Sequence, residues 1–214
     1  PQAMYPEGGL SVDGRLREPK LGLLDYMLKG FSPDAERDLV FIPVGINYDR
    51  VIEDRSLLRK LDEKPPRGSL WRTLRITGAY LGRQFVFTLI GRRYRYGYAC
   101  VNFGRPLSMR EWVRERGVDF RGLTDAQRRE AVGAVGQALM ATIGRTIPVL
   151  PVPLVARVLV ADPQRAWSEL ELKSAVLALM GRAEAQGAHV YVPRSDRDYA
   201  ISVGLRMLTL RHLA

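Results

Sequence analysis

A short stretch near the start of the chain carries the residues best suited to binding an anion. It reads Tyr5-Pro-Glu-Gly-Gly-Leu-Ser-Val-Asp-Gly-Arg-Leu16. Gly8 and Gly9 allow a tight turn that presents backbone N–H groups to a ligand, and Glu7 and Ser11 add a carboxylate and a hydroxyl. The chemistry to expect of such a loop is recognition of a small anionic substrate.

Three cations follow within a few residues: Arg15, Arg17 and Lys20. Arginine suits a phosphate or carboxylate because its planar guanidinium can bond two oxygens at once. An ordinary surface loop has the same composition, with glycines for turns and charges for solubility, and composition alone favours that plainer interpretation.

Groups that could act as a general base are scarce. His189 and His212 are the only histidines, and no His-x-x-x-x-Asp pattern occurs, since Arg194 stands five residues after His189. Cys100 lies in an apolar run with no histidine nearby in sequence, which favours packing over nucleophilic chemistry. We therefore expect no catalytic residue, metal site or cofactor within this chain.

Composition indicates a folded protein with an anionic partner. The chain has 214 residues, 46% of them hydrophobic, and a net charge of +10. Nucleic acid, an anionic membrane surface and phosphorylated substrates all fit this charge. A single cysteine excludes an internal disulfide framework, and no apolar run approaches the roughly 18 to 20 residues that span a bilayer.

The long stretch between Glu63 and Glu111 contains no acidic residue at all. Cations mixed with aromatics could stack on single-stranded nucleic acid or lie on an anionic lipid surface. They could also be the two faces of ordinary strands. We favour a basic patch that faces an anion. Its basic residues are Lys64, Arg67, Arg72, Arg75, Arg83, Arg92, Arg93, Arg95, Arg105 and Arg110, and its aromatic residues are Trp71, Tyr80, Phe85, Phe87, Tyr94, Tyr96, Tyr98 and Phe103.

The first part of the chain has an α/β pattern. Residues 20–31 carry apolar side chains at helical spacing, and the apolar run 39–46 predicts a strand buried on both faces of a parallel sheet. Pro43 lies inside that run and removes a hydrogen-bond donor, which favours an edge strand or the end of a strand at this position. Asn47-Tyr-Asp-Arg50 follows the strand, where sites often form. The pattern further predicts a charged helix over 51–63, a strand over 98–107 and a short helix over 108–116.

After residue 120 the pattern becomes helical. Capping boxes at Thr124–Gln127 and Ser168–Glu171 each open a helix, and 154–161 reads as a short apolar helix. Residues 189–192 predict a strand or an extended link. From Asp196 a final helix places Tyr199, Val203, Met207 and Leu210 on one face. We therefore expect an α/β part over 1–120 and a helical region over 121–214.

The opening loop resembles the Phe-x-Glu-Gly-x-Arg-Ser block of the glycerol-3-phosphate acyltransferase family, and is most similar to its large bacterial membrane-associated members. Pro19-Lys-Leu-Gly22 extends the resemblance. Further similar blocks follow in the family's order. They are Phe41-Ile-Pro-Val-Gly-Ile-Asn-Tyr48, Tyr98-Ala-Cys-Val-Asn-Phe-Gly-Arg-Pro-Leu107 and Pro151-Val-Pro-Leu-Val-Ala156.

The resemblance implies transfer of a fatty acyl group from acyl-CoA or acyl carrier protein to glycerol 3-phosphate, on the cytoplasmic face of the inner membrane. It implies that the base is the His of a His-x-x-x-x-Asp block upstream of Pro1, so the chain is expected to be a fragment. Residues 1–120 are then expected to be the C-terminal part of the acyltransferase α/β domain, and residues 121–214 a helical C-terminal region that is truncated. It also implies an acceptor site at Glu7, Gly8, Gly9 and Ser11, and an apolar acyl-side wall that includes Pro43.

Leu10 departs from the family pattern, which usually has an arginine there as a phosphate ligand. Arg15, Arg17 or Lys20 could substitute, the acceptor could differ, or phosphate affinity could be reduced. A non-catalytic membrane-binding scaffold is the main alternative. A nucleic-acid module ranks lower, because the chain lacks a helix dense in arginine and lysine, and we expect no nucleic-acid partner.

Overall fold

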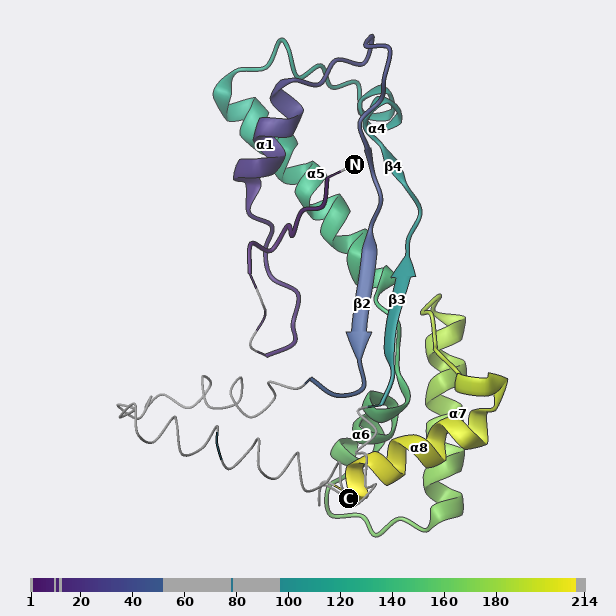
Figure 1. Cartoon of the computed structure of the whole chain (residues 1–214). Coiled ribbons are helices and arrows are strands. Elements are labelled where there is room, and N and C mark those ends of the chain that lie inside the picture. Colours follow the sequence, from purple (N-terminus) through teal and green to yellow (C-terminus); the bar gives the residue numbers. More distant parts are fainter. Residues whose placement is uncertain (1, 10, 12, 52–77, 79–96, 211–214) are drawn as a thin grey trace.

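The computed structural model describes residues 2–9, 11, 13–51, 78 and 97–210 (Figure 1). The expected helix over 51–63 and most of the acid-free stretch lie outside these residues.

The first part of the chain forms a helix, two short antiparallel strand pairs and a second helix. Its elements are α1 (Leu21–Lys29), β1 (Val40–Phe41), β2 (Val44–Tyr48), β3 (Ala99–Phe103), β4 (Leu107–Ser108) and α4 (Met109–Arg116). The α1 helix ends at Gly30, and the Ser108 hydroxyl caps α4 by accepting the Glu111 N–H. The mixed α/β pattern that the sequence predicts is confirmed.

The expectation of a parallel, fully buried strand over 39–46 is wrong. Strand β1 pairs with β4 and β2 pairs with β3, and both pairs are antiparallel. Pro43 separates β1 from β2 because it has no N–H to donate to a ladder. Side chains alternate between a covered face and an open face along β2, so the apolar run is not buried on both sides.

A first hydrophobic core joins α1, α4 and the N-terminal half of α5 (Asp125–Thr146). Leu24 and Leu28 of α1 pack here with Met109 and Trp112 of α4. Helix α1 lies along α5 (Figure 1), and an ion pair between Arg128 and Asp25 links the two helices. This core holds α1, and with it the end of the preceding loop, against a long helix.

The C-terminal part consists of helices around a second core. Its elements are α6 (Pro151–Ala161), α7 (Glu169–Ala185), the 3-10 turn η1 (Pro193–Ser195) and α8 (Arg197–Thr209). Both predicted capping boxes are present, at the start of α5 and of α7. Helix α6 begins three residues before the predicted Leu154, because Pro151 suits the first helical position.

The predicted apolar face of α8 is wrong in part. Met207 is buried, but Leu210 is exposed, and the buried face also includes Ile201, Gly204 and Leu208. A Cβ at Gly204 would lie 2.8 Å from the carbonyl oxygen of Pro151, so this glycine allows α8 to lie close to α6. Val203 of the predicted face is half-buried against the second core, whereas Leu210 follows the last residue of α8.

The extended link over 189–192 makes a single parallel bridge, between Val149 and Val190. It connects the end of the α7 region to the segment between α5 and α6. The proposed division near residue 120 remains a prediction. The first half of α5, which follows that position, packs against the first core.

Candidate functional site

The predicted acceptor loop begins with a tight turn at Gly8. The Gly8 N–H donates to the Tyr5 carbonyl at 2.9 Å, and φ of Gly8 is +66°. A Cβ built on Gly8 would lie 2.5 Å from Cδ of Lys20, so the lysine side chain passes directly over the glycine. Only glycine combines this positive φ with such a close contact at low cost.

Two hydrogen bonds fold the following segment back onto this turn. The Lys20 N–H donates to the Pro6 carbonyl at 2.8 Å, and the Arg17 N–H donates to Oε2 of Glu7 at 3.2 Å. The structure thus brings Glu7, Gly8 and Lys20 together, with the Arg17 backbone beside them. Glu7 already accepts a bond from the protein, which fixes its position in the turn.

Ser11 and Arg15 belong to a second, separate turn around Asp13. The Ser11 hydroxyl donates to Oδ1 of Asp13 at 2.8 Å, and the Arg15 N–H donates to the same oxygen at 3.1 Å. The hydrogen bonds from Arg15 and Ser11 lower the pKa of Asp13 below its usual value. Nε of Arg15 lies 3.9 Å from the Asp13 carboxylate, and the Arg15 side chain is 87% exposed, so an anion in solution could reach it.

Gly9 lies in the open, since a Cβ there would meet nothing within 4 Å. Leu10, the position where the family pattern has arginine, lies outside the described residues. The predicted binding residues are therefore split between the Gly8 turn and the Asp13 turn. Their role in binding an acceptor stays a prediction.

Helix α5 supports this loop with a line of glycines. Leu16 lies 2.9 Å from a Cβ built on Gly144, and Pro19 lies 3.1 Å from one built on Gly136. The Gln137 side chain also donates to the Glu18 carboxylate. Because these glycines have no side chains, the segment after the loop can lie directly on the helix, which fixes the loop relative to the first core.

Pro43 lies away from the loop, between β1 and β2. It is buried, and its carbonyl accepts the Gly104 N–H at 2.8 Å. A Cβ on Gly104 would lie 3.4 Å from Cβ of Pro43 and within 2.3 Å of the Thr146 hydroxyl oxygen. The structure does not bring Pro43 together with Glu7, Gly8 or Ser11, and its predicted place in an acyl-side wall stays a prediction.

The polar residues in β2 and β3 hold the segment between α5 and α6, a role that the sequence pattern did not predict. The Asn47 amide donates to the Pro148 carbonyl at 2.8 Å, and the Asn102 amide donates to the Thr146 carbonyl at 3.0 Å. Asn47 lies within β2 rather than after a strand that ends at residue 46. The signal available was two asparagines in otherwise apolar strands.

Asp49 completes this attachment. Its carboxylate accepts the Tyr98 N–H at 3.0 Å and the Val152 N–H, in the first turn of α6, at 3.1 Å. The side chain is 7% exposed, and burial raises the pKa of this carboxyl while the two backbone hydrogen bonds oppose that effect. A carboxylate at a helix N-terminus is favoured, so Asp49 acts as a structural anchor here.

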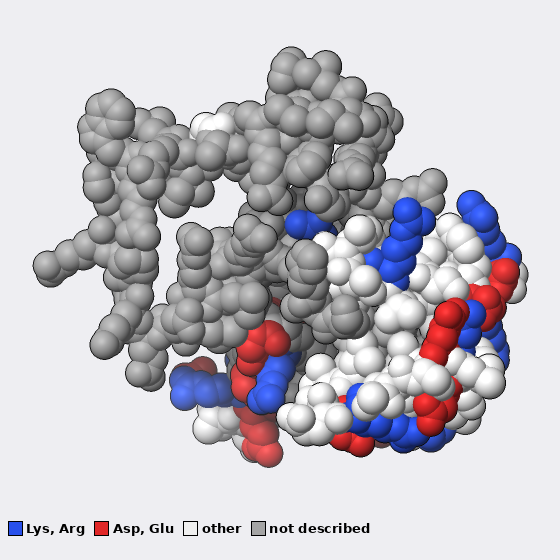
Figure 2. Space-filling model, turned by 90° about the horizontal axis from the view of Figure 1, so that it is seen from below, with Lys and Arg blue, Asp and Glu red and all other residues white. Residues whose placement is uncertain are grey.

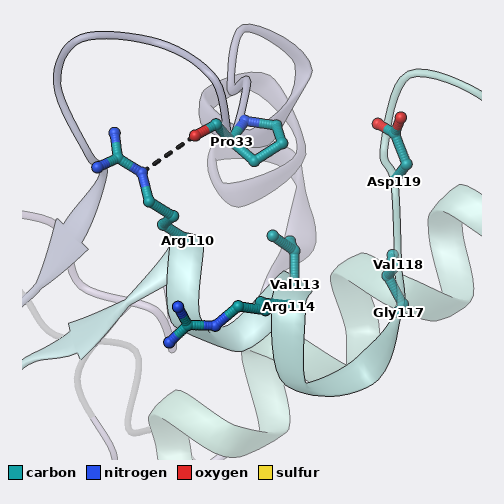
Figure 3. Close-up of a pocket in the computed structure, with 7 residues that line it drawn as sticks. All are labelled: Pro33, Arg110, Val113, Arg114, Gly117, Val118 and Asp119. Atoms are coloured by element: carbon teal, nitrogen blue, oxygen red, sulfur yellow. Dashed lines mark hydrogen bonds between the residues drawn. The ribbon is translucent and has the colours of Figure 1, made fainter.

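A separate hollow of about 400 Å³ lies beside α4 (Figure 3). Its wall combines apolar side chains with Arg110 and Arg114, and Arg110 donates from Nε to the Pro33 carbonyl at 3.0 Å. None of the predicted acceptor-site residues lines this hollow. Its lining residues are Pro33, Arg110, Val113, Arg114, Gly117, Val118 and Asp119.

Comparison with known proteins identifies the family. The model of the family described as the glycerol-3-phosphate acyltransferase C-terminal region matches residues 86–213. The chain therefore belongs to the glycerol-3-phosphate acyltransferase family, as the order of its sequence blocks predicts.

Several bacterial proteins named glycerol-3-phosphate acyltransferase are similar over nearly the whole chain. Those of Pseudomonas fluorescens (strain SBW25) and Pseudomonas syringae pv. syringae (strain B728a) are 28% and 30% identical over 206 residues, which is 92% of this chain and 23% of each relative. The protein of Alteromonas mediterranea is 28% identical over 201 residues, covering 90% and 22%. The chain thus spans less than a quarter of the length of these relatives.

Among the helices that the structure describes, none combines the length and the apolar character that a membrane span needs.

Proposed function

We propose that the polypeptide to which this chain belongs is a glycerol-3-phosphate 1-O-acyltransferase. It transfers a fatty acyl group from acyl-CoA or acyl carrier protein to glycerol 3-phosphate, the first step of phospholipid synthesis. The observation that carries the proposal is the family match over residues 86–213, combined with a loop ahead of it in which Gly8 and Lys20 are in direct contact.

In this proposal the loop binds the phosphate of the acceptor. Lys20 and Arg17 supply positive charge beside the Gly8 turn, and Arg15 supplies a further cation at the loop tip. A base in the part of the polypeptide before Pro1 removes the proton of the 1-hydroxyl, whose oxygen attacks the thioester carbonyl carbon. The carbon–sulfur bond breaks, and the thiol leaves with a proton.

We also propose that the protein lies peripherally on the anionic cytoplasmic face of the inner membrane. Exposed apolar side chains lie close to the loop: Tyr5 is 83% exposed, and Tyr26 and Leu23 project from α1. Lys20 and Lys29 stand at the two ends of the same helix. Exposed aromatic and basic side chains suit the headgroup layer of an anionic membrane.

Nucleic acid is the less favoured partner. On the face shown in Figure 2 the described basic and acidic side chains lie beside one another. In the helical part, Lys173 pairs with both Glu169 and Asp198, and Arg197 pairs with Glu184. Cations already paired with carboxylates give a weak field for a polyanion.

The test is acyl transfer by the full polypeptide that contains this region. With a long-chain acyl-CoA and labelled glycerol 3-phosphate, the proposal expects a labelled 1-acyl product, and absence of product with either acyl-CoA or acyl carrier protein donors would favour the non-catalytic scaffold. Replacing Leu10 with the arginine of the family pattern, Leu10→Arg, should lower KM for glycerol 3-phosphate. An unchanged KM would count against the loop as the phosphate site.

A further inference from the structure

Two consecutive residues ahead of α8 hold a backbone conformation that favours glycine. Arg194 has a φ of 60° and Ser195 has a φ of 55°, and no other described residue apart from glycines has a positive φ. A long side chain in this left-handed region is strained, and such strain persists most often where it positions a functional group. The strain at η1 therefore indicates a role for the side chain that this turn carries, which is an arginine.

The turn places the Arg194 guanidinium over an aromatic ring. Its Cζ lies 4.3 Å from the centroid of the Tyr199 ring. A hydrogen bond joins the side chains of Tyr199 and Tyr98 and raises the pKa of Tyr98. The Tyr191 ring meets the Tyr98 ring edge-on, with 5.4 Å between the centroids. Three phenols and one guanidinium thus gather from the residue before β3, the extended link, η1 and the start of α8, and we call this group the tyrosine cluster.

The charge of Arg194 has no carboxylate partner within the described part of the chain, and its side chain is exposed. The neighbouring charged groups are engaged elsewhere. Arg197 pairs with Glu184 at 2.8 Å, and Asp196 caps α8 by accepting the Tyr199 N–H at 3.0 Å. Stacking on a ring occupies the face of a guanidinium and leaves the N–H donors on its edge. Arg194 can therefore bind an anion that comes from outside the chain.

The donors of the tyrosine cluster suit a phosphate group. The positive charge of Arg194 acts on the Tyr98 hydroxyl as well as on the Tyr199 ring, so the guanidinium and the phenols lie around the same point. A phosphate offers several acceptor oxygens to donors that approach from different directions, and both guanidinium and phenol groups can donate. A carboxylate has only two oxygens in one plane, and a guanidinium alone can bond both.

We propose that the tyrosine cluster binds the phosphate group of a phosphorylated ligand, which is a soluble phosphate ester or the headgroup of an anionic lipid. The acceptor loop contributes no residue to the cluster, so the inference does not depend on the proposed function. A phosphate bound there would touch Tyr98 beside β3 and Arg194 in η1. It would therefore bridge the strand pair and the helical part, the same two regions that Asp49 joins.

Fluorine NMR of the full polypeptide tests the inference, with a fluorotyrosine in place of Tyr191. This label reports on the tyrosine cluster rather than on the acceptor loop. Inorganic phosphate and vesicles of phosphatidylglycerol are the two probes. Each is titrated into the parent protein, Arg194→Gln and Arg182→Gln, and Arg182 is an exposed arginine of α7 outside the cluster. We expect the apparent Kd for at least one probe to rise about tenfold in Arg194→Gln and less than about twofold in Arg182→Gln.

The two probes distinguish the sources of the phosphate. A shift of the label with inorganic phosphate indicates a soluble ester, and a shift with the vesicles alone indicates a lipid headgroup. Arg194→Gly removes the guanidinium and also relieves the strained φ, so it should bind as weakly as Arg194→Gln without unfolding at a lower temperature than the parent. No shift of the label with either probe, or equal effects of Arg194→Gln and Arg182→Gln, would overturn the inference.

Discussion

The carboxylate of Asp49 accepts the backbone N–H of Val152 at 3.1 Å, although the two residues are separated by 103 positions. Its other oxygen accepts the Tyr98 N–H at 3.0 Å. One buried side chain therefore joins the end of β2, the residue before β3 and the first turn of α6. Together with the hydrogen bonds from Asn47 and Asn102, this contact attaches the strands to the helical part.

Replacing this carboxylate should destabilise the protein in proportion to the acceptors lost. Asp49→Ala leaves two buried N–H groups without their partner, and we expect a loss of about 1–3 kcal/mol in the free energy of unfolding, measured by urea denaturation. Asp49→Asn keeps one acceptor oxygen, so its free energy of unfolding should lie between those of the parent protein and Asp49→Ala. Asp34→Asn, at an exposed ion pair with Arg121, is the control and should change stability by less than about 1 kcal/mol. Equal effects of Asp49→Ala and Asp34→Asn would contradict the role of Asp49.

The stability conferred by Asp49 should depend on pH in a defined direction. Burial raises the pKa of this carboxyl above its ordinary value of 3.8. The folded state therefore binds the proton more tightly than the unfolded state, so the favourable contribution is complete below pH 3.8 and is lost as pH rises through the folded-state pKa. The stability of the parent protein relative to Asp49→Asn should fall over that rise. The comparison with Asp49→Asn cancels the effects of other carboxylates. A difference in unfolding free energy between the two proteins that grows as pH rises would contradict a raised pKa for Asp49.

The close approach of the β2–β3 strand pair to the end of α5 depends on Gly45. A Cβ there would lie 2.6 Å from the backbone of Thr146 and Ile147, which cannot move independently. Gly45→Ala should cost about 1–3 kcal/mol, as expected of overpacking against backbone. Gly22→Ala is the control, because nothing lies within 4 Å of its Cβ and alanine is the better helix former, so stability should rise slightly. Thermal unfolding that shows Gly45→Ala to be neutral would refute the close contact.

Gly8 offers a test of the loop that separates backbone strain from the contact with Lys20. Gly8 and Gly14 have φ of +66° and +73°, so alanine is strained at both positions. Only at Gly8 would the new Cβ meet Lys20, since nothing lies within 4 Å of a Cβ at Gly14. Gly8→Ala should raise KM for the acceptor severalfold more than Gly14→Ala in an acyl-transfer assay of the full polypeptide. Equal changes would show that the position of Lys20 over Gly8 does not matter for binding.

The capping box of α7 predicts an unusually acidic carboxyl group. Hydrogen bonds from the Ser168 hydroxyl and N–H, with a further one from Arg165, lower the pKa of Glu171 to about 2. Its ionised form therefore stabilises the fold above pH 4.5, and this contribution is lost as pH falls towards 2. NMR titration of the Glu171 carboxyl should give a midpoint at a pH of about 2. Titration near 4.5 would show that the capping box is not formed in solution.

Local signals in the sequence predicted the helices well. Capping boxes at Thr124 and Ser168 open α5 and α7, and Gly30 ends α1, because these interactions involve only neighbouring residues. Strand pairing was predicted less well. A continuous apolar run gives no information on whether its partner is parallel or which face is covered, and the covered face proved to be the one with Gly45 and Asn47.

The candidate site was predictable as a sequence block but not as a geometry. The order of the blocks gave the family, and family membership is confirmed over residues 86–213. The separation of Ser11 and Arg15 from Glu7 and Lys20 was not predictable, because it arises from the turn around Asp13. The role of Asp49 as a link to Val152 depends on packing between elements far apart in the chain.

The most direct test of the proposed function is the transfer of a labelled acyl group from acyl-CoA to glycerol 3-phosphate by the full polypeptide, compared with its Glu7→Ala variant. Glu7 holds the loop by accepting the Arg17 N–H at 3.2 Å. We predict a labelled 1-acyl-glycerol 3-phosphate product with the parent protein and a rate at least about tenfold lower with Glu7→Ala, the effect of losing about 1.4 kcal/mol of transition-state stabilisation. Equal rates in the two proteins, or no product from the parent with any acyl thioester donor, would contradict the proposal.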